Sequence, residues 1–432
     1  MITMRIVMKR MTSTSFYLVM LSLLAVFAQP VATQTQFVER AKQQAKDKAM
    51  KGHFGRSVSI SGDLEIVGAP GHDSNAGAAY LFERDLSNGM LTQVEKLQAN
   101  SPMTNGRFGQ SVSIDDNGTP MVLNDDQIIV GAPGENNEAG AAYIFEHSGS
   151  AWNLTPVKLA VADLQAHDFF GTSVSISGDR ALVGAPGRGG NPGAAYLFER
   201  DGSGIWQEVE KLQVNGLHGG SSFGYSVAIH DDWALVGAYK ESDTNGIILG
   251  AAYVFNAADW SSPLHRLTGT FQNPGSRFGL SVSLNSDWAI IGEWGGNANN
   301  NIGAAYIYEV GPWTEVAKRQ GPDPSDSFGY SVSIDDNGTP NPNDDRAIVG
   351  ASGDDEGATN AGAAFLFESA GGAWAQPLQK LQACDKDLAD RFGTSVSISG
   401  DRAVVGAYLE ETGGTDSGAV YVFESSLCGC GH

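Results

Sequence analysis

The sequence predicts an all-β fold: a seven-bladed β-propeller with four-stranded blades, closed by an N-terminal strand. One motif recurs seven times along the 432 residues, and each copy contains short segments with the pattern of strands. A further strand-like segment precedes the first copy and matches the one that is missing after the last. Four short strands per unit of about 40 to 50 residues are typical of a propeller blade.

The recurring motif is Phe-Gly followed by x-Ser-Val, and successive copies begin 50 to 64 residues apart. The copies begin at Phe54, Phe108, Phe170, Phe223, Phe278, Phe328 and Phe392. No copy shows the 3.6-residue apolar period of a helical repeat, so helical solenoids are excluded.

Each copy contains four predicted strands. In the first copy, Ser57–Ser61 alternates in polarity, Ile66–Pro70 is a second strand with its exit, Gly77–Phe82 is a third, and Val94–Gln98 alternates again. In later copies a tryptophan opens the fourth segment, at Trp152, Trp206, Trp260, Trp313 and Trp374. Small residues in the first two strands fit the crowded axis of a propeller, and aromatic residues in the third fill the wider space outside it.

The two ends of the repeat array predict how the ring closes. Seven Phe-Gly motifs are followed by only six fourth strands, since the chain nearly ends after Val420–Phe423. Gln36–Arg40 resembles the fourth strand of the first copy, so we expect Phe37–Lys42 to complete the last blade and remove its exposed edge. The predicted organisation is a signal peptide at 1–28, an N-terminal segment at 29–53 that includes the closing strand, seven repeats at 54–427 and a tail at 428–432.

The N-terminus has the pattern of a secretory signal. Arg5, Lys9 and Arg10 precede the apolar run Ser15–Ala28, which is too short to span a membrane comfortably. No later stretch is apolar enough to cross a bilayer. We therefore expect a secreted or cell-surface protein, extracellular or periplasmic, that does not span the membrane.

Charge and cysteine content exclude several classes. The formal net charge of -22 disfavours binding to nucleic acid or to anionic membranes. The three cysteines, Cys384, Cys428 and Cys430, are too few for a disulfide scaffold. The tail from Cys428 to His432 has soft metal ligands, but one short cluster cannot fill a tetrahedral shell, so a plain terminus is the favoured interpretation.

The Phe-Gly…Gly-Ala-Pro pattern resembles the FG-GAP repeat of integrin α-subunit propellers, and more closely the short bacterial and algal variety. The resemblance covers nearly the whole chain after residue 28. Gly-Ala-Pro is intact at Gly68, Gly131 and Gly184 and drifts in the other four copies. The resemblance implies extracellular recognition, although a fold does not fix a function.

An aspartate precedes the second strand of every copy, in the place of the closing carboxylate of the family's calcium loops. In five copies the turn is too short to wrap Ca²⁺, so a hairpin aspartate is expected. Two copies insert about ten residues that are rich in oxygen ligands. The candidate calcium ligands are Asp115, Asn117, Asp125 and Asp126 in one copy, and Asp335, Asn337, Asp344 and Asp345 in the other. Thr119 and Thr339 replace the third carboxylate, and Asn-Gly also favours a plain, longer hairpin.

The loops between second and third strands are expected on one face, and such loops usually bind the ligands of propellers. Tyr239 and Trp294 lie at the ends of second strands and are candidates to stack on a sugar or a peptide. No catalytic residue emerges, because the repeated serines have no repeated histidine or aspartate partner.

The favoured function is a binding or adhesion module for an extracellular protein or glycan. The alternatives are a secreted hydrolase or lyase with its site in the central funnel, and a structural component of an extracellular matrix. First strands that are nearly identical in all seven copies disfavour an enzyme.

Overall fold

The structure is a computed structural model, and it describes residues 35–117, 125–187, 190–270, 274–295, 302–323, 326–336, 339, 341, 344–370, 373–374, 377 and 379–427. The predicted signal peptide, Asn337 and the tail with Cys428 and Cys430 lie outside the described residues. Phe37–Ser425 forms one compact unit. No helix in the described ranges is long and apolar enough to span a bilayer.

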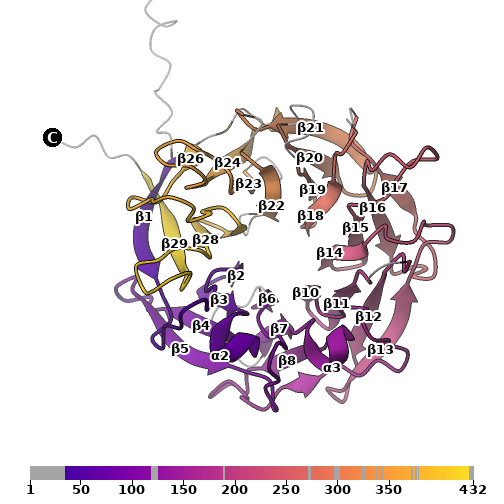
Figure 1. Ribbon diagram of the computed structural model, residues 1–432, viewed down its shortest axis with the longest axis horizontal. Helices are drawn as coiled ribbons and strands as arrows, with labels where there is room; N and C mark the ends of the chain where they lie inside the picture. Colours follow the sequence, from indigo (N-terminus) through magenta and orange to yellow (C-terminus); the bar gives the residue numbers. More distant parts are fainter. Residues whose placement is uncertain are drawn as a thin grey trace, which may run out of the picture. The chain divides into compact units, whose positions relative to one another are not determined.

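This unit is a propeller of seven antiparallel sheets arranged in a ring, as predicted (Figure 1). Blade 1 consists of β2 (Ser57–Ser61), β3 (Leu64–Ala69), β4 (Ala78–Arg84) and β5 (Leu91–Leu97). Blade 2 consists of β6 (Ser111–Asp115), β7 (Gln127–Gly131), β8 (Ala142–Glu146) and β9 (Val157–Lys158). Blade 3 consists of β10 (Ser173–Ser177), β11 (Arg180–Ala185), β12 (Ala194–Arg200) and β13 (Trp206–Leu212).

The second half of the ring continues the pattern. Blade 4 consists of β14 (Phe223–His230), β15 (Trp233–Ala238), β16 (Ala251–Asn256) and β17 (His265–Leu267). Blade 5 consists of β18 (Phe278–Leu284), β19 (Trp288–Glu293), β20 (Ala304–Glu309) and β21 (Thr314–Gln320). Blade 6 consists of β22 (Phe328–Asp335), β23 (Arg346–Ala351), β24 (Ala363–Ala370), β25 (Ala373–Trp374) and β26 (Gln379–Leu381). Blade 7 consists of β27 (Ser395–Ser399), β28 (Arg402–Ala407), β29 (Ala419–Leu427) and the N-terminal β1 (Thr35–Gln43).

The N-terminal strand closes the ring, as the strand count predicts. β1 is hydrogen-bonded to β29 and is the outermost strand of blade 7 (Figure 1). Phe37 is 1% exposed, and the side chain of Gln379 in blade 6 bonds to both its N–H (2.8 Å) and its carbonyl (2.7 Å). Lys42 forms ion pairs with Asp385 (2.6 Å) and Glu410 (2.8 Å). The first strand of the chain therefore holds the last blade to its neighbour.

The repeated serines join each blade to the next. The first serine of every x-Ser-Val motif donates from its hydroxyl to the carbonyl of the Phe-Gly glycine in the following blade, at 2.8 to 3.0 Å. Ser395 of blade 7 donates to Gly55 of blade 1, so the series runs round the whole ring. Each bond is worth about 1 kcal/mol.

This series explains two of the repeated glycines. The Phe-Gly glycine has a positive φ, for example 86° at Gly109, a conformation that glycine adopts without steric cost. A Cβ on the second-strand glycine would meet the incoming carbonyl: at Gly131 it would lie 2.0 Å from the oxygen of Gly171. Phe-Gly and Gly-Ala-Pro are thus two sides of one contact between blades.

Aromatic side chains fill the space between neighbouring blades. Phe54 packs edge-on against Tyr80 at 5.6 Å between centroids, and the same pairing recurs in the other blades, with Phe365 in the tyrosine position of blade 6. The buried clusters combine residues of adjacent blades, as Leu64 and Ile66 of blade 1 do with Ile128 and Val130 of blade 2.

The outer strands differ from the prediction in three blades. In blades 2, 4 and 6 the strand begins after a proline, at Val157, His265 and Gln379, rather than at Trp152, Trp260 and Trp374. Proline has no N–H to donate to the third strand, so each tryptophan lies in the preceding loop or, for Trp374, in the separate strand β25.

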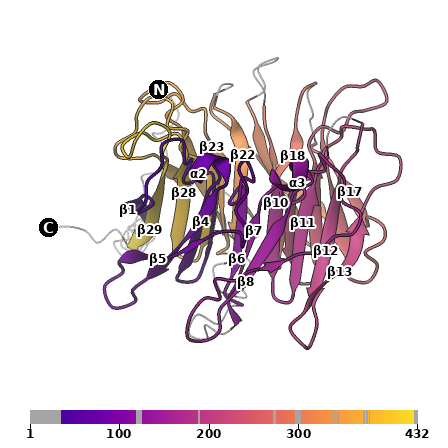
Figure 2. The same ribbon diagram turned by 60° about the horizontal axis from the view of Figure 1, so that its bottom comes forward.

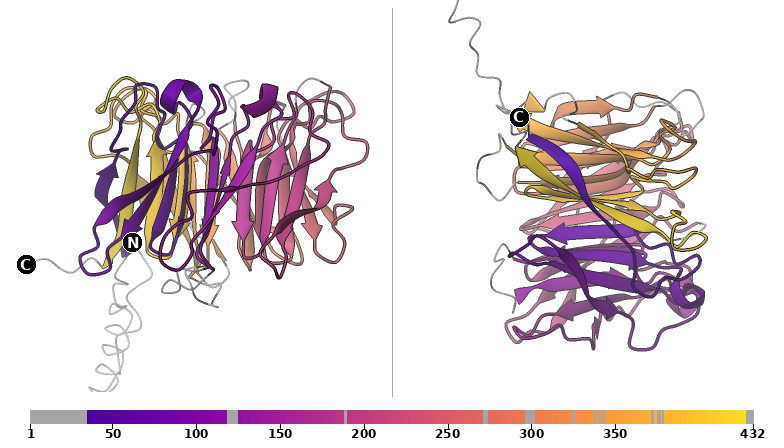
Figure 3. Two further views of the ribbon diagram at one scale, coloured as in Figure 1. Left: turned by 90° about the horizontal axis from the view of Figure 1, so that it is seen from below. Right: turned by 90° about the vertical axis from the view of Figure 1, so that its left-hand side faces the viewer.

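The propeller has two faces. The Phe-Gly face carries the Phe-Gly dipeptides, the exits of the second strands and the loops to the third strands. Two of these loops contain the short helical turns α2 (His72–Asn75) and α3 (Glu135–Glu138), which lie at the same edge of the ring (Figures 2 and 3). The hairpin face carries the turns between first and second strands, including both insertions.

Candidate functional site

On the hairpin face, the repeated aspartate has a backbone role in every blade. Its carbonyl accepts the N–H of a residue near the end of the third strand, as Asp126 does from His147 (3.1 Å) and Asp345 from Ser369 (2.8 Å). The other five acceptors are Asp63, Asp179, Asp232, Asp287 and Asp401. Because the acceptor is the backbone carbonyl, this hydrogen bond leaves the aspartate side chain available for another role.

The first aspartate of each insertion is engaged with the next blade. Asp115 accepts the N–H of Gly178 in blade 3 at 2.6 Å, and Asp335 accepts that of Gly400 in blade 7 at 2.8 Å. Asn117 donates its side-chain amide to the carbonyl of Asp125. These contacts hold the two loops against the ring, and they occupy oxygens that the sequence assigned to calcium.

Asp126 and Asp345 are the exceptional carboxylates of the two loops. Asp126 is 2% exposed and Asp345 is 0% exposed, and no carboxylate oxygen of either completes a hydrogen bond. Burial, reinforced by neighbouring carboxylates, raises the pKa of Asp126 to about 7. Burial likewise raises the pKa of Asp345 to about 7, although the indole of Trp288 lies beside it. In the other five blades the equivalent aspartate is partly or fully exposed.

The described part of the two loops does not amount to a metal centre. It holds no group of three or more His, Cys, Asp or Glu side chains arranged to bind an ion. Residues 118–124, 337–338, 340 and 342–343 lie outside the described residues, Thr119 and Asn337 among them. Thr339 is described, and its hydroxyl donates to Asp344 at 2.8 Å.

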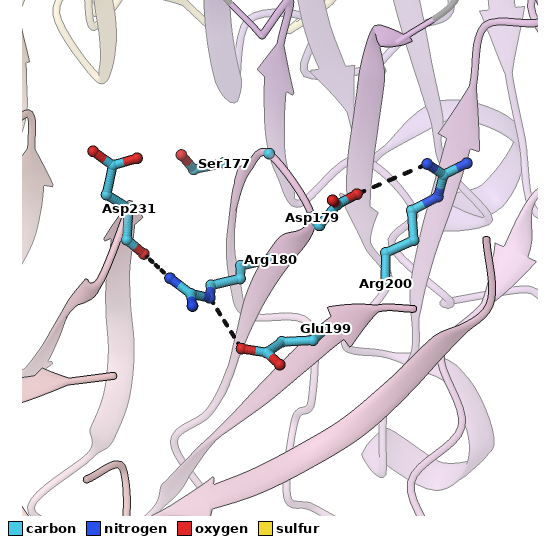
Figure 4. Close-up of a pocket in the computed structure, with 7 residues that line it drawn as sticks. Ser177, Asp179, Arg180, Glu199, Arg200 and Asp231 are labelled. Atoms are coloured by element: carbon cyan, nitrogen blue, oxygen red, sulfur yellow. Dashed lines mark hydrogen bonds and ion pairs between the residues drawn. The ribbon is translucent and has the colours of Figure 1, made fainter. Parts of the chain in front are cut away.

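Two polar cavities open beside these turns. One, of about 250 Å³, is lined by residues that include Asp125, Asp126, Glu146 and Arg200. The other cavity has a volume of about 300 Å³, and Arg200 lines both cavities. Figure 4 shows the residues that line this second cavity. There Arg180 bonds Glu199 at 3.0 Å, and Arg200 faces Asp179 at 3.8 Å. Each guanidinium of the second cavity already faces a carboxylate, so that cavity has little charge to offer a ligand.

On the Phe-Gly face, the two predicted stacking residues lie side by side under one arginine. The guanidinium of Arg277 lies 4.2 Å from the ring centroid of Trp294 and 5.9 Å from that of Tyr239. Tyr239 is buried and packs against Tyr225 at 4.4 Å. Because Arg277 covers part of both rings, whether they also stack on a ligand stays a prediction.

The same cluster extends across the axis of the propeller. Arg56 of blade 1 lies 5.3 Å from the ring of Tyr408 in blade 7 and interacts with the phenol of Tyr330 in blade 6. Tyr330 in turn contacts Trp294 at 6.5 Å. We call these seven side chains the mouth cluster: Arg56, Tyr225, Tyr239, Arg277, Trp294, Tyr330 and Tyr408.

The sequence identified two members of the mouth cluster, Tyr239 and Trp294, and the other five were not predicted from it. Arg56, Tyr225 and Tyr330 follow the Phe-Gly glycine, where the other four blades have Gln110, Thr172, Leu280 and Thr394. Variation at this position was the available signal, since the surrounding motif is constant. The repeated serines, by contrast, donate to carbonyls between blades, which gives them a structural role.

The chain matches the FG-GAP repeat family in seven segments. These are residues 37–82, 91–145, 155–198, 206–255, 265–308, 313–367 and 374–423. They cover most of the sequence, so the chain belongs to the FG-GAP repeat family. The first segment runs from β1 through the third strand of blade 1, so the family's repeat is offset from the blade by one strand, as the closure requires.

A more distant likeness connects the chain to an integrin. Integrin alpha-2 of Mus musculus is 31% identical over 125 residues, which are 27% of this chain and 10% of the integrin. The aligned part is thus a small fraction of that relative's length. Together with the fold and the family, the likeness indicates a binding- or adhesion-type module.

Proposed function

We propose that this protein is a secreted or cell-surface adhesion module whose Phe-Gly face recognises an extracellular protein or glycan. The observation that carries the proposal is the mouth cluster. At positions within an otherwise uniform repeat, five blades supply unlike arginine and aromatic side chains that meet at the axis. A rigid scaffold that displays variable side chains on one face is the usual design of a binding module.

Exposed acidic residues in the loops around the mouth cluster also favour the Phe-Gly face as the binding face. Asp73, Asp355, Glu356 and Glu411 are exposed in the loops between second and third strands. With the apolar N-terminal run and the likeness to an integrin segment, they favour a soluble propeller that meets its partner outside the cell.

The test is a screen of the mature chain against arrays of extracellular proteins and glycans, with and without Ca²⁺. Two variants then locate the binding face. Trp294→Ala changes the mouth cluster, and Trp260→Ala makes the same substitution in a turn on the hairpin face. Melting curves of both establish that each variant is folded. Ligand binding lost with Trp294→Ala and kept with Trp260→Ala supports the proposal, and equal effects contradict it.

We further propose that the two insertions bind Ca²⁺ weakly, with Asp126 and Asp345 as their principal ligands. A buried carboxylate without a hydrogen-bond partner is costly, and a divalent cation would offset that cost. Asp125 and Asp344 are further candidates. The replacement of a third carboxylate by Thr119 and Thr339 places the expected dissociation constant at about 10⁻⁴ to 10⁻³ M, the range of extracellular modules.

Calorimetry with matched variants tests the calcium proposal. Asp126→Asn with Asp345→Asn should abolish both the heat and the melting shift caused by Ca²⁺, whereas Asp179→Asn, at the same repeat position without an insertion, should keep them. At a hundredfold excess over the dissociation constant the ion should stabilise the wild type by about 2.7 kcal/mol. Asp115→Ala with Asp335→Ala should also weaken binding, but these changes remove hydrogen bonds to Gly178 and Gly400 as well. A wild type that shows neither heat nor a melting shift leaves the loops as plain hairpins.

A further inference from the structure

Arg56 and Arg277 are held by aromatic rings and not by carboxylates. Their guanidinium groups lie 5.3 Å from Tyr408 and 4.2 Å from Trp294. No ion pair links either arginine to an acid in the part of the chain that the structure describes. Both side chains are half-buried, so part of each remains open to solvent.

This arrangement is unusual for the arginines of this chain. With a net charge of -22, carboxylates are abundant, and most described arginines pair with one. The paired arginines are Arg40, Arg84, Arg107, Arg180, Arg200, Arg266, Arg346 and Arg402. Two arginines kept free of acids near the axis of an acidic protein form a local positive site.

Residues around the two arginines prepare them to accept an anion. Tyr225 lies near both guanidinium groups, and burial raises its pKa to about 12, so it stays neutral and keeps its proton as a donor. Cation–π contacts fix the planes of the guanidinium groups without neutralising their charge. A planar guanidinium held in this way matches a carboxylate with two parallel hydrogen bonds.

We propose that the mouth cluster binds the carboxylate of a single acidic side chain, presented by a peptide loop of a partner protein, through Arg56 and Arg277. This inference rests on the proposed function and names the chemistry of the ligand. The exposed acids around the mouth, Asp73, Asp355, Glu356 and Glu411, would repel a polyanion such as an acidic polysaccharide. They would attract basic residues that flank one central carboxylate.

Two peptides test the charge requirement. The first is N-acetylated, C-amidated Lys-Ser-Glu-Ser-Lys with a fluorescent label, and the second has glutamine in place of the glutamate. Binding is measured by fluorescence anisotropy at low ionic strength, where screening is small. The acidic peptide should bind the wild type at least about tenfold more tightly than the amide, because the amide cannot accept charge-assisted hydrogen bonds from the two guanidinium groups.

Variants then assign the binding to the arginines. Arg277→Gln should remove the preference for the acidic peptide, and Arg277→Lys should keep only part of it, since lysine lacks the planar fork. Arg319→Gln on the outer strand β21 is the matched control, because it removes the same charge from the same blade, and it should leave the preference unchanged. Melting curves verify that all three variants are folded.

Three results would overturn the inference. The first is equal affinity of the wild type for the two peptides, and the second is an equal loss of the preference for the acidic peptide in Arg277→Gln and Arg319→Gln. The third is binding of polygalacturonate that depends on Arg277 and is tighter than binding of the acidic peptide. None of these results decides the proposed function, which fails if Trp294→Ala and Trp260→Ala affect the binding of array ligands equally.

Discussion

Closure by β1 can be tested at a single side chain. Phe37 is the most enclosed residue of the strand, 1% exposed, and it belongs to the buried cluster that joins blade 7 to Ile348 and Leu366 of blade 6. Arg346 lies 5.5 Å from its ring. Phe37→Ala would remove a whole ring from this cluster and leave a cavity.

The expected cost follows from this burial. Truncation of a fully buried phenylalanine to alanine costs about 3–5 kcal/mol, from lost transfer free energy and the residual cavity. That is a large part of the roughly 5–15 kcal/mol by which a folded domain is stable. Arg40→Ala on the same strand is the control. Its side chain is 50% exposed and its contact with Glu424 is long, at 3.6 Å, so we expect a change below about 1 kcal/mol.

The assay is equilibrium unfolding in urea, followed by tryptophan fluorescence. The Phe37→Ala midpoint should fall well below that of the wild type, and that of Arg40→Ala should stay close to it. Limited proteolysis adds a local readout, since a weakened β1 should be cleaved before the rest of the ring. If Phe37→Ala unfolds within about 1 kcal/mol of the wild type, Phe37 does not hold the ring closed.

Three further predictions concern the strand β1, the contact between blades and the buried carboxyl group of Glu65. Deletion of residues 29–44 should expose the edge of β29 and lower the melting temperature markedly, and an unchanged melting curve would refute the closing role of β1. Gly131→Ala should destabilise the ring by about 1–3 kcal/mol, because the new Cβ would lie 2.0 Å from the carbonyl oxygen of Gly171; Gly202→Ala, with nothing within 4 Å, is the control and should be close to neutral in the same urea assay. Glu65 is 0% exposed, lies 3.9 Å from Arg402 of blade 7, and has its pKa raised by burial from 4.5 to about 7. The folded state binds the proton of Glu65 more tightly than the unfolded state does. Protonated Glu65 therefore contributes up to about 3 kcal/mol to the free energy of unfolding, and this contribution is fully present below pH 4.5 and is lost as the pH rises through about 7. The difference in unfolding free energy between wild type and Glu65→Gln should change across that range, and a constant difference would show that Glu65 does not titrate there.

The candidate sites were predictable to different degrees. The two insertions stand out in the sequence because they interrupt a regular spacing, and Asp126 and Asp345 were named from that irregularity. Sequence could not distinguish their roles from those of Asp115 and Asp335. The carboxylates of Asp115 and Asp335 accept N–H groups of the next blade, some sixty residues away, while those of Asp126 and Asp345 are buried and complete no hydrogen bond.

The sequence by itself determined the repeat number, the strand order within a blade and the route of closure. The repeat number and strand order follow from local periodicity, because blades 1 to 6 are built from contacts close in the chain, and the route of closure follows from counting the strands. The tertiary structure alone decided what the repeated letters do between blades and what the unrepeated ones do at the axis. Ser57 and Gly109 belong to different blades, and Arg56 and Tyr330 meet near the axis although they lie more than two hundred positions apart in the chain. Such contacts depend on the curvature of the closed ring, which no local pattern encodes.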